Sequence, residues 1–140
     1  MSISIQSRKS KGRKLQQHIC KLAKEIFNLG DGDIESRSMG AFGEDLMMSP
    51  RARAVLPVSI ECKNQKNFPS LAAIRQSEAN KPDNFYATAC WHPPGAKYDD
   101  SIIYMTARTF FTMINDINTR HELDKDFLKL IPERLINAPN

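Results

Sequence analysis

The sequence lacks any apolar run near the roughly 18 residues that a membrane-spanning helix needs, and its basic N-terminus is not followed by the apolar core of a signal peptide. Cysteine is scarce as well. The three cysteines, Cys20, Cys62 and Cys90, are odd in number and far apart in the sequence. Free thiols in a reducing compartment suit that pattern better than a disulfide framework does. We therefore expect neither a membrane protein nor a secreted one, and the expected location is the cytoplasm.

Acidic side chains are absent from the first 24 residues, and this absence is more informative than the net charge of +4. The basic side chains of that segment are Arg8, Lys9, Lys11, Arg13, Lys14, Lys21 and Lys24. The rest of the chain carries a net charge of −3, so a polyanion would meet the N-terminal segment first. Charge alone leaves two interpretations open, a contact with nucleic acid and a solvated basic arm.

Internal repeats, low-complexity tracts and linkers rich in Gly, Pro or Ser are also missing. A chain of 140 residues with 41% hydrophobic and 26% charged residues has the composition of one soluble globular domain. Such a chain buries roughly two-thirds of the surface that it exposes when unfolded. We expect a basic N-terminal arm at 1–11, one domain at 12–118 and a C-terminal helical extension at 119–140.

Apolar residues at three- and four-residue spacing predict several helices. Ser49 followed by Pro50 is typical of a helix start, because serine caps the first turn and proline fits its first position. In the third of these helices we expect Leu71, Ala72 and Ile74 to point inward. The expected helices span residues 12–28, 50–56, 69–79, 107–118 and 122–136.

Alternating residue types predict a strand over 58–64, with Ser59, Glu61 and Lys63 on one face and Cys62 turned to the other. The order of elements, helices mixed with strands, favours an α/β domain that borders on α+β, with a central mixed β-sheet flanked by helices. The other expected strands span residues 34–38, 46–48, 84–91 and 101–106.

Acidic residues occur at two of the expected strands. Asp45 follows a glycine-bearing bend, and Glu61-Cys62-Lys63 comes after fifteen intervening residues, on the 58–64 strand. Carboxylates from two strand edges, with the backbone carbonyl of Cys62, offer the oxygen ligands that magnesium prefers. A lysine beside them would orient a water or stabilise charge on a phosphate. This pattern indicates metal-assisted phosphodiester hydrolysis, although Glu-x-Lys taken alone is usually a solvated ion pair.

These segments resemble a known family. The run RSMGAFGEDL from Arg37 and the run SIECKN from Ser59 look like the PD-(D/E)XK nuclease superfamily, above all its small phage and prophage members similar to archaeal Holliday-junction resolvases. The run SKGRKLQ from Ser10 resembles the start of their first helix. The resemblance covers residues 8–79 and implies a restriction-endonuclease-like fold, DNA as the substrate and Mg²⁺ as the cofactor, with Mn²⁺ as a substitute.

The resemblance also assigns roles by position. It implies that Asp45 and Glu61 bind the metal and that Lys63 is the catalytic lysine. Two positions depart from the family's pattern: Glu44 replaces the proline before Asp45, and Gln16 replaces an acid of the first helix. Gln16 can still accept a hydrogen bond from water at the site, but it adds no negative charge.

The remaining candidates are polar residues for DNA contact. A solvated turn is the alternative for the two arginines after Pro50, and a polar strand end is the alternative for the glutamine after the 58–64 strand. Two His/Cys pairs at 18/20 and 90/92 lack the spacing of a zinc site. The expected DNA-contacting residues are Arg8, Lys9, Lys11, Arg13, Lys14, Arg51, Arg53 and Gln65.

The sequence thus predicts a magnesium-dependent DNA endonuclease, selective for branched DNA such as a four-way junction, in a bacterial cell or a phage-infected host. Two symmetric cuts need two active sites, so we expect a homodimer, formed through the apolar helices after residue 107. A nicking or restriction-like nuclease on duplex DNA shares the same site. Gln16 leaves a DNA-binding protein without catalysis as an alternative, and a small interaction protein with a surface Glu61–Lys63 pair is the third.

Overall fold

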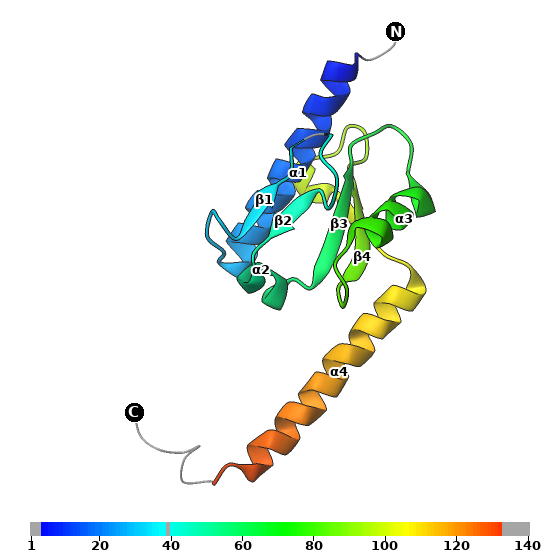
Figure 1. Ribbon diagram of the computed structural model, residues 1–140. Coiled ribbons are helices and arrows are strands. Elements are labelled where there is room, and N and C mark those ends of the chain that lie inside the picture. Colours follow the sequence, from blue (N-terminus) through cyan, green and yellow to red (C-terminus); the bar gives the residue numbers. More distant parts are fainter. Residues whose placement is uncertain (1–3, 39, 133–140) are drawn as a thin grey trace. The chain divides into compact units, whose positions relative to one another are not determined.

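The computed structural model describes residues 4–38 and 40–132, apart from the side chain of Phe127. It divides into two units, Met1–Thr106 and Ala107–Asn140, which are described separately. The first unit mixes helices and strands as an α+β domain (Figure 1). The unit boundary falls after Thr106, whereas the sequence placed the end of the domain at 118.

The first helix, α1 (Ile5–Phe27), begins before the predicted residue 12. Ser4 caps it by accepting a hydrogen bond from the backbone N–H of Ser7 at 3.2 Å, and Asn28 ends it in the left-handed conformation with φ of 53°. The segment predicted as an arm is therefore helical from Ile5 onward. Its side chains are mostly polar and exposed, so apolar periodicity gives no sign of a helix there, while its lysines, arginine and glutamine are good helix formers.

The strands form two sheets, one of two strands and one of three (Figure 1). β1 (Ile34–Ser36) pairs with β2 (Leu46–Met48) in antiparallel orientation. β3 (Val58–Lys63) and β4 (Tyr86–Trp91) are parallel, and β5 (Ile102–Tyr104) runs antiparallel to β4. The predicted mixed sheet is thus present as a three-stranded sheet, with β1 and β2 as a second ladder beside β3. The short helix α2 (Pro50–Val55) starts at the predicted cap, Ser49.

Helices cover both faces of β3 and β4. Leu15 and Ile19 of α1 share the larger apolar cluster with Ile60 and Cys62 of β3. Helix α3 (Ser70–Asn80) covers the other face. The polar face of β3 is therefore buried too, and Ser59 is 1% exposed. Burial on both faces is what a parallel strand pair requires, because crossover helices lie on each side of it.

Helix α3 turns a different face inward from the one predicted. Ala73, Ile74 and Ser77 are buried, whereas Leu71 and Ala72 are exposed, so two of the three expected inward residues are wrong. The Ser77 hydroxyl donates to the backbone carbonyl of Ser59 at 3.0 Å. Small residues on this face let the helix approach the sheet closely. The packing gained by this close approach exceeds what burial of the larger apolar side chain of Leu71 would give.

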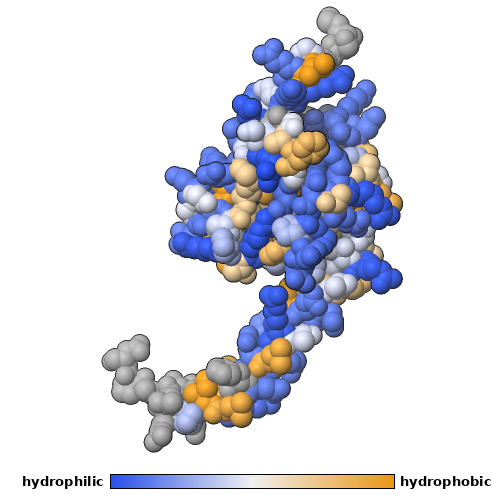
Figure 2. Space-filling view, viewed as in Figure 1, coloured by the Kyte–Doolittle hydropathy of each residue, from blue (hydrophilic) through white to orange (hydrophobic). Residues whose placement is uncertain are grey.

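Helix α4 (Ala107–Leu130) is continuous, whereas two helices were predicted. The predicted gap, residues 119–121, contains neither glycine nor proline, and the Thr119 hydroxyl donates to the carbonyl of Asn115 at 2.9 Å as helical threonines do. The predicted residues 133–136 lie outside the described residues. Figure 2 shows apolar side chains on the surface of α4, and the most exposed of the described ones are Leu130, Phe111 and Leu123. None of the helices in the described ranges is long and apolar enough to cross a membrane.

The inward face of α3 is testable by stability. Replacing Ile74, which is 1% exposed, by alanine should lower the free energy of unfolding by about 2–5 kcal/mol, because it leaves a cavity against β4. Leu71→Ala on the same helix should change it by no more than about 0.5 kcal/mol. Urea unfolding followed by circular dichroism measures both. Equal losses from the two variants would show that α3 packs differently.

Candidate active site

A glycine bend delivers Asp45 to the sheet. Gly40 and Gly43 have φ of +85° and +107°, and a Cβ on Gly43 would lie 3.1 Å from the guanidinium carbon of Arg37. Arg37 donates from Nε to the carbonyl of Glu44 at 2.6 Å and from its backbone N–H to the carbonyl of Asp45 at 2.7 Å. Glycine at 43 is therefore required by both its backbone angle and this close approach. Arg37 closes the bend, a role that the sequence did not reveal.

The Asp45 side chain reaches the edge of β3. Its Oδ2 accepts a hydrogen bond from the backbone N–H of Cys62 at 2.7 Å. In an extended strand the N–H and C=O of one residue point to the same edge. The carbonyl of Cys62 therefore faces the same side as the Asp45 carboxylate, as its predicted role as a metal ligand requires.

Glu61 and Lys63 lie side by side on the face of β3 that α3 covers. Nζ of Lys63 is 3.1 Å from Oε1 of Glu61, and the predicted shared face is confirmed. Glu61 is only 5% exposed. The pair is therefore not the solvated surface pair of the third alternative, because burial of a carboxylate is unfavourable unless a partner compensates for it.

The pKa shifts show that the two carboxylates interact. Burial raises the pKa of Asp45, and the Cys62 N–H, Lys63 and Arg37 oppose that rise. Burial also raises the pKa of Glu61, the negative charge of Asp45 raises it further, and Lys63 opposes the rise. Two carboxylates that repel each other in a partly buried place, with Lys63 and Arg37 acting on them, are an arrangement that a bound cation would stabilise.

Other acidic and basic candidates have structural partners. Glu44 is 7% exposed and bonds through Oε1 to Nη2 of Arg53 at 2.5 Å. The guanidinium of Arg53 also lies over the Phe85 ring, 4.8 Å from its centroid. Arg53 was expected at a phosphate, but the structure holds it in this pair. Arg51, exposed, donates to the backbone carbonyl of Asn28 at 3.1 Å.

Gln16 and Gln65 lie apart from the face of Glu61. Gln16 is 3% exposed on α1, the helix that packs against the opposite face of β3. Gln65 was expected to continue the strand, but β3 ends at Lys63, and the Gln65 amide donates to the carbonyl of Asn67 at 3.0 Å. The structure does not bring either glutamine onto the face that carries Glu61 and Lys63.

The basic candidates of the N-terminal segment all lie on α1 and are exposed. Because residues 5–11 are helical, their charges are carried by a rigid element rather than by a free arm. Side chains three and four residues apart share one side of a helix, so Arg8, Lys11 and Lys14 form a row along α1, and Lys9 and Arg13 lie together on another side.

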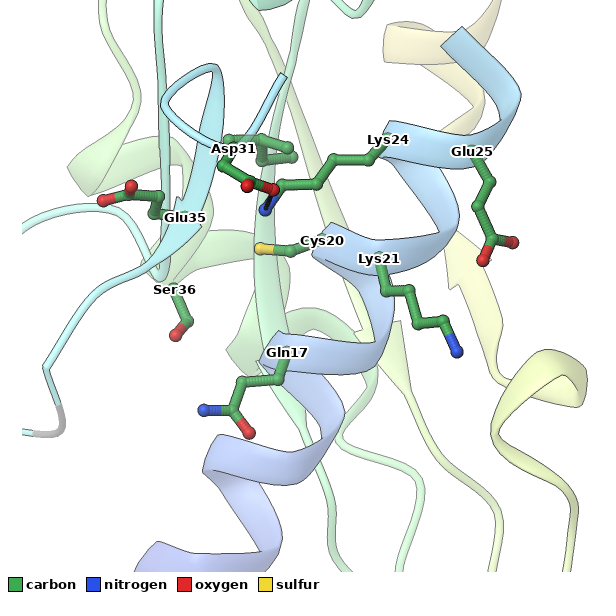
Figure 3. A pocket seen from close by; sticks show the side chains of 9 residues that line it. Gln17, Cys20, Lys21, Lys24, Glu25, Asp31, Glu35 and Ser36 are labelled. Carbon is green, nitrogen blue, oxygen red and sulfur yellow. Dashed lines mark ion pairs between the residues drawn. The ribbon is translucent and has the colours of Figure 1, made fainter. Parts of the chain in front are cut away.

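A groove of about 570 Å³ lies between α1 and β1 (Figure 3). Gln17, Cys20 and Lys24 reach toward β1, whereas Lys21 and Glu25 point away from it. Nζ of Lys24 lies 3.5 Å from Oδ1 of Asp31. Both acidic and basic side chains line this groove, so its charge favours neither a polyanion nor a metal ion.

The described residues contain no cluster of three or more histidine, cysteine or acidic side chains suited to a metal. His18 Nε2 bonds to Oδ1 of Asp99 at 2.6 Å, and His92 Nδ1 bonds to the Ser101 hydroxyl at 3.0 Å. The three cysteines are free and buried. The candidate oxygen ligands near Asp45 are its own carboxylate, that of Glu61 and the carbonyl of Cys62.

Comparison of the chain with family models, with curated proteins and with solved structures found no match in any of the three. The function is therefore argued from the residues and from the geometry around Asp45, Glu61 and Lys63.

The burial of Glu61 has a consequence for stability at different pH values. A carboxyl group with a raised pKa keeps its proton in the folded chain where the unfolded chain has lost it, so the free energy of unfolding falls as the pH rises from its ordinary pKa of 4.5 to the raised one. In chelator, Glu61→Gln should therefore melt at a higher temperature than the unaltered chain at pH 7–8, and the difference should vanish at about pH 4.

Glu78→Gln is the matched control, because Glu78 is an exposed carboxylate on α3. It should leave the melting temperature nearly unchanged at every pH. A Glu61→Gln variant that melts at a lower temperature than the unaltered chain at pH 7–8 would show that the Lys63 pair outweighs burial and the repulsion from Asp45.

Proposed function

We propose that this protein is a magnesium-dependent DNA endonuclease of the PD-(D/E)XK type that hydrolyses phosphodiester bonds and selects branched DNA. The observation that carries the proposal is the convergence of Asp45, Glu61 and Lys63, which come from two segments and share a buried place. The order of α1, the β1–β2 ladder, β3, α3 and a parallel β4 supports the restriction-endonuclease-like part of the proposal.

The oxygen atoms at the site suit a hard divalent cation. Asp45, Glu61 and the Cys62 carbonyl would hold Mg²⁺, and Mn²⁺ would substitute, because both ions prefer oxygen ligands and keep positions open for water and phosphate. A bound cation of this kind supplies Lewis-acid polarisation of a phosphate oxygen. Asp45 is positioned for this role by its bond to the Cys62 N–H, which fixes one carboxylate oxygen and orients the other.

Lys63 is the residue best placed to act on the phosphate. Glu61 holds its ammonium group at 3.1 Å, beside the two carboxylates. There the ammonium stabilises negative charge that develops on the phosphate and orients the water that attacks it. The side chain of Lys63 is 25% exposed, so it can reach a substrate while the carboxylate that positions it stays buried.

DNA binding is assigned to the basic row of α1. Lysine and arginine side chains contact backbone phosphates without reading base sequence, and their binding weakens with salt. Two cuts on a symmetric junction need two such sites, so the proposal includes a homodimer. The exposed apolar residues of α4, such as Phe110, Ile114 and Ile117, are the proposed contact with the second copy.

A DNA-binding protein without catalysis is the second candidate. The observation that favours it is Gln16, which provides no charge where the resembling family has an acid, so the site holds two carboxylates. Against it stands the burial of Glu61, because a protein that only binds DNA gains nothing from carboxylates kept near phosphate.

The deciding experiment compares a labelled immobile four-way junction with a linear duplex of matched sequence, each with magnesium and with a chelator. We expect paired cuts near the branch point that require magnesium. Asp45→Asn, Glu61→Gln and Lys63→Ala should each reduce the cleavage rate by at least about a hundredfold, since each removes a group that acts on the transition state. Junction binding by Lys63→Ala in chelator should stay within about threefold.

Glu78→Gln controls for the loss of a carboxylate and should cut at the unaltered rate. Equal cutting of junction and duplex would place the protein with nicking or restriction-like nucleases. Tight binding without cutting in magnesium or manganese would favour the DNA-binding protein. Full cleavage by Asp45→Asn would overturn the metal assignment.

Neutralising three exposed cations of α1 tests the DNA contact. Replacing Lys11, Arg13 and Lys14 by alanine should weaken binding to all DNA sequences and reduce the slope of log affinity against log salt by about 2–3. The control removes three positive charges elsewhere, at Arg75, Lys81 and Lys129, and should leave the slope nearly unchanged. Fluorescence anisotropy across a salt series measures both. An unaltered slope in the first variant would exclude these three cations of α1 from the DNA contact.

A further inference from the structure

A pocket of about 620 Å³ lies where the catalytic strand ends. One wall is formed by Arg8 and Lys11 of α1, and another by Asn64 and Lys66, which follow β3. His92, which follows β4, completes the lining together with neighbouring residues. The volume falls within the range of about 300–1,000 Å³ typical of small-molecule sites, and it exceeds what a lone phosphate would fill.

The walls are tied to one another. The Asn64 amide donates to the backbone carbonyl of Lys11 at 3.0 Å, which joins α1 to the end of β3. His92 is 8% exposed, and its ring stacks on Tyr98 at 4.4 Å with an interplanar angle of 12°. The pocket is therefore built from connected elements and does not depend on one mobile side chain.

The lining favours an anion with a polar organic part. Arg8, Lys11 and Lys66 are cationic, and no acidic residue is among the described residues that line the pocket. Burial lowers the pKa of His92, so its imidazole is neutral near neutral pH and offers a flat polar ring rather than a fourth charge. Three cations suit a phosphate, and the side-chain carbonyl oxygens of Asn64 and Gln65, whose amide nitrogens donate to backbone carbonyls, suit a donor on the edge of a base.

The pocket adjoins the site proposed for cleavage. Asn64 follows Lys63 in the chain, and the backbone N–H of His92 donates to the carbonyl of Lys63 at 3.1 Å. Lys63 lies on the face of β3 that α3 covers, whereas Arg8 and Lys11 belong to α1 on the other face. A DNA strand that presents a phosphate to Lys63 would therefore have to pass around the end of β3 to bring a neighbouring nucleotide to this pocket. A base inside a duplex is stacked and paired, so only an unpaired nucleotide can enter a pocket of this kind.

We propose that this pocket binds a single unpaired nucleotide of the DNA strand beside the cut, with its phosphate between Arg8, Lys11 and Lys66. The inference rests on the proposed nuclease function and deepens it. It gives a physical reason for selection of branched DNA, because nucleotides at a branch point or flap are free to leave the stack. A free mononucleotide offers the same chemistry, and the two sources are separable by experiment.

The first arm of the test measures binding of thymidine 5′-monophosphate, thymidine and inorganic phosphate to the full chain in chelator, by calorimetry. We expect the monophosphate to bind more tightly than either fragment, and Lys66→Ala to weaken it at least about fivefold through loss of a charge-assisted contact. Lys21→Ala is the matched control, because Lys21 is an exposed lysine on α1 that does not line this pocket. It should bind the monophosphate as the unaltered chain does.

The second arm measures binding of a flapped DNA and of a fully paired duplex, again in chelator. Lys66→Ala should weaken the flapped DNA at least about threefold more than the duplex, whereas a plain phosphate contact would weaken both equally. Thymidine 5′-monophosphate should compete with the flapped DNA. Circular dichroism confirms that each variant is folded.

The outcomes separate the pocket from the nuclease proposal. Lys66-dependent binding of the monophosphate with unaltered DNA binding would overturn the DNA part and leave a site for free mononucleotides. No Lys66-dependent effect on either ligand would overturn the pocket, even in a protein that cuts the junction. Lys66-dependent effects in both arms would support the pocket, even if Asp45→Asn shows that nothing is cut.

Discussion

The hydrogen bond from the Cys62 N–H to the Asp45 carboxylate joins the two sheets on which the site depends. β1 and β2 form one sheet and β3, β4 and β5 form the other, and β2 lies beside β3. At this seam a side chain accepts the strand N–H in place of a backbone carbonyl. A buried N–H without an acceptor costs about 1–3 kcal/mol, so the same bond that closes the seam also holds a carboxylate beside Glu61.

Two ion pairs lie beside that hydrogen bond, and they differ in the charges that surround them. Glu44 and Arg53 neutralise each other, and the Phe85 ring covers the guanidinium, so this pair anchors α2 to the bend. Glu61 and Lys63 also pair, but Asp45 lies near enough to raise the pKa of Glu61. The second cluster therefore holds two carboxylates beside Lys63 and the nearby Arg37, and a bound cation would reduce the repulsion between Asp45 and Glu61.

Helix α1 serves two environments along one element. From Leu15 to Ala23 its inward residues form the core against β1 and β3, while its first three turns carry cations in water. The Asn64 amide donates to the Lys11 carbonyl and so fixes the basic part of the helix at the end of β3. A rigid link between the basic helix and Lys63 would hold a bound DNA strand in register with the site, which a free arm would not do.

Local signals determined much of this protein. The alternation of β3, the Ser49 cap and the glycine bend before Asp45 predicted their elements, and Glu61 and Lys63 share a face because side chains alternate along any strand. The start of α1, the inward face of α3 and the continuity of α4 escaped prediction. The start of α1 depends on a cap and on polar helix formers, the inward face of α3 on a close contact through small residues, and the continuity of α4 on the absence of glycine and proline. None of these features produces a strong apolar pattern in the sequence. The sequence also could not tell which acid is neutralised, because Glu44 and Asp45 are neighbours in the chain. Only the tertiary structure decided this, by placing Arg53 against one carboxylate and the N–H of Cys62 against the other, and by burying Glu61 beneath α3, where burial and the charge of Asp45 raise its pKa.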